Sequence, residues 1–144
     1  MTEVFIRYIH FIGILSLSSM LVVEHTLLKT QLTIAEVKRL AVVDAIYGLS
    51  AVVTFLAGLT LWLWVGKPPA FYTGNPVFHA KLGVFILLAL LSILPTVFFL
   101  KHRKSGQTHI EVPKMIIHLV RLELVVLLVI PALAVLMAHG YGLA

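Results

Sequence analysis

The sequence predicts an all-α membrane protein, an up-and-down bundle of four transmembrane helices with both termini on the outer side. Three observations support this fold: the composition, four long apolar stretches, and the placement of Lys and Arg. Of 144 residues, 60% are hydrophobic and 12% are charged, and the mean hydropathy is +1.06. A soluble domain carries about 25% charged residues. The composition therefore excludes a soluble enzyme and a disordered chain.

The apolar stretches predict helices at about 4–28, 40–66, 76–100 and 115–139. Each is long enough to cross about 30 Å of hydrocarbon. A cleaved signal peptide is disfavoured for the first stretch, because Glu3 and Arg7 give it a mixed-charge start. The chain shows no repeat or linker, so we expect a single integral membrane domain over residues 1–144.

The first helix has no charge from Phe11 to Val23, yet it carries a polar stripe. At 100° per residue, the polar members of this stripe share an arc of about 120°. They are Arg7, His10, Ser18, Glu24 and His25. Ionisable groups in lipid cost several kcal/mol, so each indicates either a function or a paired contact.

The second and third helices each add ionisable groups. Asp44 shares a helix face with Tyr47 and several small residues through Gly58, where a flat ligand could approach. In the third helix Lys81 and Ser92 share a face, and Pro95 predicts a kink. His79 lies about 200° from Lys81, so a regular helix cannot aim both inward.

The fourth helix has a narrow stripe of His118, Arg121 and His139, which we expect to face the bundle interior. Glu123 points almost the opposite way, so we expect it on the outer face, where it would favour self-association into a homo-oligomer.

The connecting segments predict the orientation. Loops 29–39 and 101–114 are rich in Lys and Arg, whereas the second loop has only Lys67 and the C-terminal tail has none. The positive-inside rule places the two basic loops in the cytoplasm. The net charge of +5 is typical of such loops, and we expect no nucleic-acid partner. The absence of cysteine excludes disulfides and zinc–thiolate sites.

Depth divides the intramembrane groups into two layers. The outer layer holds Arg7, His10, His79, Lys81 and His139. Neutral imidazole binds iron, so a histidine among neutral or cationic neighbours is a candidate haem ligand. The inner layer contains both charge signs, and we expect it to form ion pairs. Its members are Glu24, His25, Asp44, His118, Arg121 and Glu123.

The stretches 75–82 (NPVFHAKL) and 91–96 (LSILPT) form a specific signature. They resemble a bacterial family of predicted four-helix inner-membrane proteins with no assigned function, as do Asp44 and Arg121-Leu122-Glu123. This likeness covers essentially the whole chain and implies a multi-pass protein of the bacterial inner membrane.

A more distant resemblance implies a cofactor. His10 and the stretch 78–82 (FHAKL) are similar to the HemJ-type protoporphyrinogen oxidases, and the CopD copper-resistance membrane proteins share the second part. The HemJ likeness implies that His10 and Lys81 are axial ligands of haem b. Lysine binds iron only as the neutral amine, which an apolar environment favours. Glu24-His25 departs from the HemJ-type Tyr-His, which weakens the case for protoporphyrinogen oxidation more than that for haem.

The sequence hypothesis is therefore a haem b protein in which His10 and Lys81 hold the iron, His79 substitutes for either, and Arg7 binds the propionates. Its role would be membrane redox chemistry, as an oxidoreductase or electron carrier between a hydrophobic small-molecule donor and an acceptor. A second haem between His25 and His118 stays open.

Two other classes stay open. One is a CopD-like metal-handling or transport protein, with the metal on His10, His79 and His139. The other is a non-catalytic assembly subunit whose outward Glu123 contacts a partner helix.

Overall fold

The computed structural model describes residues 1–65 and 73–139, and these form four long helices and two short strands. All four helices are long and apolar enough to cross a membrane, which confirms the predicted all-α bundle of four transmembrane helices. The expected end of the second helix at Gly66, and Lys67 beyond it, lie outside the described residues. The elements are α1 (Thr2–Leu27), β1 (Gln31–Thr33), α2 (Ile34–Thr60) with its π-helical continuation η1 (Leu61–Val65), α4 (Pro76–His102), β2 (His109–Glu111) and α5 (Lys114–Ala138).

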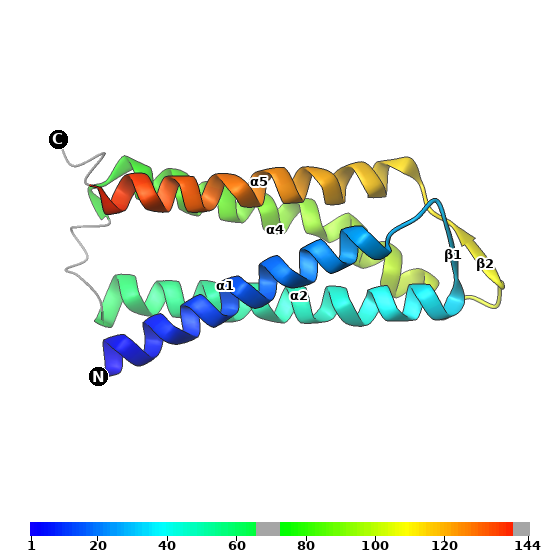
Figure 1. Ribbon diagram of the computed structural model, residues 1–144, viewed down its shortest axis with the longest axis horizontal. Coiled ribbons are helices and arrows are strands. Elements are labelled where there is room, and N and C mark those ends of the chain that lie inside the picture. The colour runs from blue at the N-terminus through cyan, green and yellow to red at the C-terminus, as the bar shows by residue number, and fades with distance from the viewer. Residues whose placement is uncertain (66–72, 140–144) are drawn as a thin grey trace.

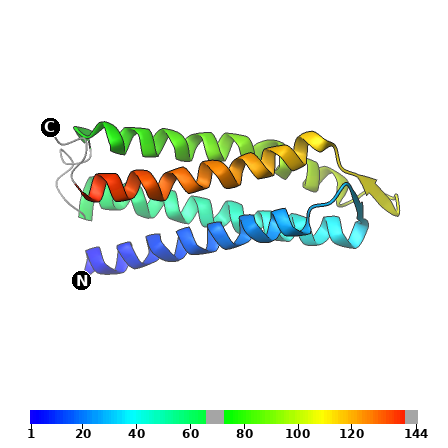
Figure 2. The same cartoon turned by 45° about the horizontal axis from the view of Figure 1, so that its top comes forward.

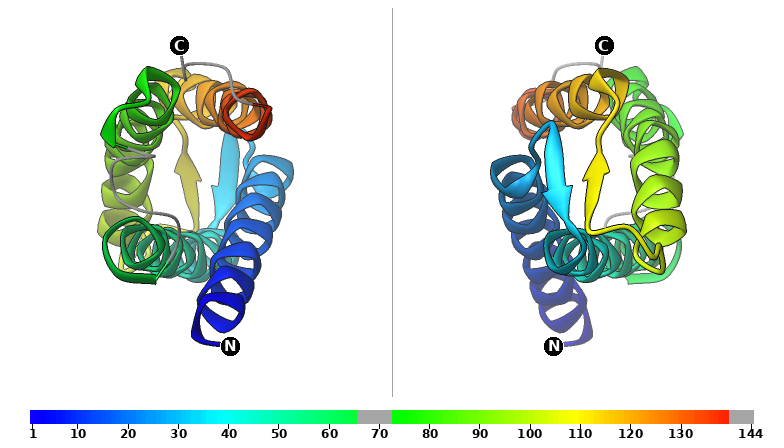
Figure 3. Two further views of the ribbon diagram at one scale, coloured as in Figure 1. Left: turned by 90° about the vertical axis from the view of Figure 1, so that its left-hand side faces the viewer. Right: turned by 90° about the vertical axis from the view of Figure 1, so that its right-hand side faces the viewer.

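The helices run along the long axis of the molecule (Figures 1 and 2). Seen from either end they occupy the corners of a square in the order α1, α2, α4, α5 (Figure 3). The closest packing is within the pairs α1–α2 and α4–α5. The start of α1 and the end of α5 lie at one end of the bundle, and the strands lie at the other. We call these the outer end and the strand end; the first name marks a place in the bundle and not a side of the membrane.

The two strands were not predicted. β1 and β2 pair antiparallel, with Leu32 opposite Ile110, and Val112 N donates to Thr30 O at 2.8 Å just beyond the pair. Leu32 and Ile110 are 0% and 2% exposed, because they point from the pair into the bundle. The strands join the first and third loops and close the strand end with apolar side chains.

α2 begins at Ile34, six residues before the predicted start, because Thr33 and Glu36 form a capping box. Glu36 N donates to Thr33 Oγ1 at 3.2 Å, and Thr33 N donates to Glu36 Oε1 at 2.9 Å. These bonds satisfy N–H groups that the first helical turn leaves without partners. The charged first turns of α2 therefore belong to the helix and not to the loop.

Side chains pack unevenly along the bundle. The hydrophobic core lies mainly in the half next to the strands, where Leu21, Leu40, Phe99 and Val120 are fully buried. Toward the outer end α1 buries no residue before Gly13, and α5 buries none after Val126. The N-terminal part of α1 leans away from α5 (Figure 3). The outer half is therefore more open than the strand half.

Candidate functional site

Three carboxyl groups from three helices are buried in the strand half of the bundle. Glu24 of α1, Asp44 of α2 and Glu123 of α5 are 1%, 4% and 1% exposed. We call them the carboxyl cluster. Glu24 and Asp44 lie within hydrogen-bonding reach of each other, and Glu123 acts electrostatically on Glu24. The bundle thus brings together residues that are 20 or more positions apart in sequence.

Two hydroxyl groups donate hydrogen bonds to this cluster. Thr96 Oγ1 of α4 donates to Asp44 Oδ2 at 2.5 Å, and Tyr47 Oη of α2 donates to Glu123 Oε1 at 3.1 Å. All four long helices therefore contribute to the cluster. Thr96 had no part in the sequence hypothesis, because a lone threonine in an apolar helix gives no pattern that marks it as a partner.

The predicted orientation of the fourth helix is wrong. Glu123 lies inside the bundle, whereas His118 and Arg121 are exposed. The cause is packing: Glu123 shares a face with Ile116, Val120 and Val126, and this face packs into the core. The apolar neighbours of Glu123 determine the orientation, and Tyr47 supplies the hydrogen bond that its carboxyl needs.

The expected ion pairs of the inner layer are also absent from the described part of the chain. The two ion pairs found there join Arg7 to Glu3 at 2.8 Å and Lys29 to Glu36 at 2.7 Å. Both lie near helix ends and are partly exposed. Because Arg121 faces outward, it does not neutralise the buried acids.

The outer half holds His10, which is half-buried on α1. Its Nδ1 lies 3.0 Å from Thr54 O of α2, and a Cβ added at Gly58 would approach its Cε1 to 3.3 Å. Lys81 of α4 is half-buried and acts electrostatically on His10, as does Arg7. The helices that carry His10 and Lys81, α1 and α4, lie at diagonally opposite corners of the bundle (Figure 3).

Other predicted site residues lie elsewhere. His79 is exposed, and its Nε2 lies 2.6 Å from Thr73 O. His139 is exposed, with Nδ1 3.0 Å from Val135 O. Across residues 1–65 and 73–139, no group of three or more His, Cys, Asp or Glu side chains is arranged to hold a metal ion.

The proposed inward pair of His25 and His118 is not formed as expected. His25 is half-buried, but His118 lies on an exposed face of α5. Two histidines that hold the same iron must both point toward it. His118, on the outside of the bundle, does not point toward His25. We propose no second haem.

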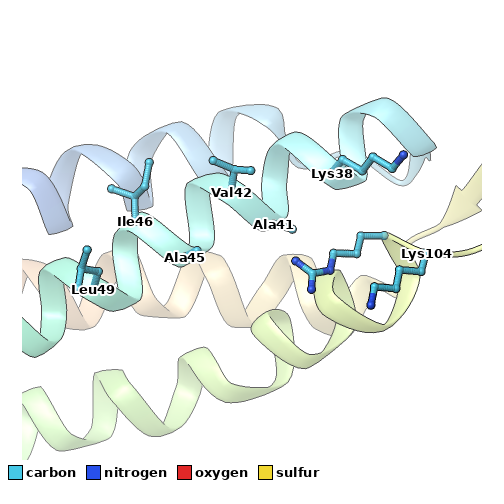
Figure 4. Close-up of a pocket in the computed structure, with 8 residues that line it drawn as sticks. Lys38, Ala41, Val42, Ala45, Ile46, Leu49 and Lys104 are labelled. Carbon is cyan, nitrogen blue, oxygen red and sulfur yellow. The ribbon is translucent and has the colours of Figure 1, made fainter.

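A hollow of about 520 Å³ lies near the strand end, between α2 and the end of α4 (Figure 4). α2 supplies the apolar side chains that line the hollow, and three cationic side chains lie at one end of it. This lining suits a ligand in which an anionic group is joined to an apolar chain. It is lined by Lys38, Ala41, Val42, Ala45, Ile46, Leu49, Arg103 and Lys104.

The chain was compared with known protein families. The family described as "Predicted membrane protein (DUF2214)" matches residues 2–142. The chain belongs to this family. The comparisons with curated proteins and with solved structures gave no match. Family membership and the four apolar helices show that this DUF2214 protein is a multi-pass membrane protein in contact with the lipid bilayer.

Proposed function

We propose that this DUF2214 protein binds haem b in the outer half of the bundle, where His10 and Lys81 would hold the iron. The observation that carries the proposal is the hydrogen bond between His10 and the backbone of α2. Haem supplies a one-electron couple when bound, so the proposed role is electron transfer between a hydrophobic donor and an acceptor.

The contact at His10 suits a metal ligand. When Nδ1–H donates to Thr54 O, the imidazole is held in one tautomer and Nε2 keeps its lone pair for iron. Histidines that bind metals commonly donate their second ring nitrogen to a carbonyl or carboxylate in this way. Thr54 is therefore a positioning residue, and Gly58 leaves the space that the ring occupies.

Lys81 is the second residue that would hold the iron. It starts from α4, across the bundle from α1, and its half-buried position in an apolar helix favours the neutral amine. Haem sites in helical bundles are built from side chains on facing helices. α1 buries no residue before Gly13 and α5 buries none after Val126, so these two helices pack against the bundle less closely in the half where the ligand would lie.

Arg7 completes the proposed site on the outer side. It lies one turn before His10 on α1, at 2.8 Å from Glu3, and acts electrostatically on His10. An arginine at this depth suits a haem propionate, because guanidinium groups bind carboxylates through paired hydrogen bonds.

The alternatives have less support. A copper site on His10, His79 and His139 is disfavoured, because these residues form no ligand set among the described residues. The assembly-subunit hypothesis depended on an outward Glu123, and this side chain is buried.

Absorption spectra of the purified protein from haem-replete cells test the proposal. We expect a Soret band and reducible haem in the wild type, and loss of both in His10→Ala. His79→Ala is the matched control and should retain the spectrum, because His79 is exposed and bonds to Thr73 O. A folded, colourless wild-type protein would overturn the proposal, as would equal haem loss in both variants.

A further inference from the structure

We propose that the carboxyl cluster of Glu24, Asp44 and Glu123 is a proton-binding site inside the membrane. The site takes up protons as its ligand, shares them between carboxyl groups and exchanges them with water. It lies in the strand half of the bundle and does not depend on haem binding at His10.

The first argument comes from unsatisfied oxygens. Thr96 and Tyr47 each donate one hydrogen bond to the cluster. Neither oxygen of Glu24 receives a hydrogen bond from a donor in residues 1–65 and 73–139, although its side chain is only 1% exposed. Asp44 Oδ1 and Glu123 Oε2 also have no such donor. A buried acceptor without a donor costs about 1–3 kcal/mol, so four of them together require donors that the side chains present do not supply.

The second argument comes from charge. Among the residues that the structure describes, the titratable groups that act on the cluster are its own members and Tyr47, while α4 contributes the neutral Thr96. No cation pairs with the cluster in residues 1–65 and 73–139, where the ion pairs lie near helix ends. Several like charges at close range in a medium of low polarity are strongly unfavourable. Bound protons remove these charges.

Bound protons supply the missing hydrogen-bond donors and also remove negative charge from the cluster. A protonated carboxyl is a hydrogen-bond donor as well as an acceptor. Because Glu24 and Asp44 lie within hydrogen-bonding reach, one proton between them supplies the missing donor and removes one charge. A metal ion is a weaker fit, because the described residues contain no group of three such side chains arranged around a common point.

The surroundings control access to the cluster. On the strand side, the apolar side chains of Leu28, Leu32 and Ile110 are at most 9% exposed. Toward the outer half, α2 continues the polar face with Ser50 and Thr54, and Ser50 Oγ lies 2.7 Å from Ser16 Oγ of α1. The cluster is therefore shielded from direct contact with water on the strand side, and the same face of α2 carries the buried hydroxyl groups of Ser50 and Thr54 toward the outer half.

Infrared spectroscopy of the full-length protein in lipid tests the site directly. We expect the C=O stretching band of a protonated carboxylic acid at neutral pH, with a shift in D₂O that demonstrates proton exchange. Glu24→Gln should remove or displace this band. Glu111→Gln is the matched control, because Glu111 is exposed on β2, and it should leave the band unchanged.

Asp44→Asn provides a second variant if Glu24→Gln does not fold, and it should also change the band. A wild-type spectrum without a protonated carboxyl band would overturn the site. A band that does not shift in D₂O would overturn proton exchange. The measurement is independent of haem, so a colourless protein with an exchangeable carboxyl band would refute only the proposed function.

Discussion

At the scale of single residues, Gly13 sets how closely α1 approaches α2. A Cβ built at this position would clash with Thr54 Oγ1 and lie 3.2 Å from Thr54 N. Transmembrane helices commonly have small residues at such contacts, because close van der Waals packing, and not the hydrophobic effect, drives helix association in lipid. The same close approach holds Thr54 O within hydrogen-bonding distance of His10, one turn earlier on α1.

Gly13→Ala should therefore destabilise the protein by about 1–3 kcal/mol, the usual cost of overpacking. Gly83→Ala is the matched control, since a Cβ at Gly83 meets no atom within 4 Å. Thermal unfolding in detergent should show a lower midpoint for Gly13→Ala than for Gly83→Ala. Equal midpoints would contradict the close helix contact.

The candidate residues show what a sequence pattern can predict. Burial of Glu24 and Asp44 follows from their position in long apolar segments, and the structure buries both. The direction of Glu123 does not follow, because helical periodicity gives the angle between Glu123 and Arg121 but not which of them faces inward. Glu123 faces inward because Val120 and Val126, on the same face of α5, pack into the core. The sequence of one helix does not show how that helix packs against the others.

At the scale of elements, the start of α2 depends on the capping box at Thr33. Thr33→Ala removes the acceptor for Glu36 N and should cost about 1 kcal/mol. Thr30→Ala is a suitable control, because Thr30 is exposed and its backbone bond to Val112 is kept. Unfolding in detergent should separate the two variants. A Thr30→Ala loss as large as that of Thr33→Ala would contradict the role of the cap.

Helices and strands differed in how well the sequence predicted them. The four helices follow from apolar length alone, since about 20 such residues cross a bilayer. The strands have three residues each, and they pair across more than 70 positions of sequence. So short a segment carries no recognisable alternation. The early start of α2 was missed for a different reason, because Lys38 and Arg39 made its first turns resemble a loop.

At the scale of the whole molecule, the basic segments predict that the strand end faces the cytoplasm. The chain has no cysteine, so single-cysteine variants report position without background. Gln107→Cys, beside β2, should react with an impermeant maleimide only after the cells are opened, whereas Thr2→Cys should react in intact cells. The reverse pattern would contradict the orientation.

The two proposed sites lie in different halves of the bundle. The strand half contains most of the hydrophobic core and the carboxyl cluster, whereas the outer half buries fewer side chains and holds His10 and Lys81. Along α1, His10 and Glu24 are separated by about 21 Å at 1.5 Å per residue. The proposed electron site and the proposed proton site are therefore separate, and each can be altered without the other.

The most direct test of the proposed function is the haem content of the wild-type protein, purified in mild detergent from haem-replete cells. The site at His10 and Lys81 predicts haem b in equimolar amount with the chain, retained through gel filtration. A folded protein that elutes without haem would contradict it.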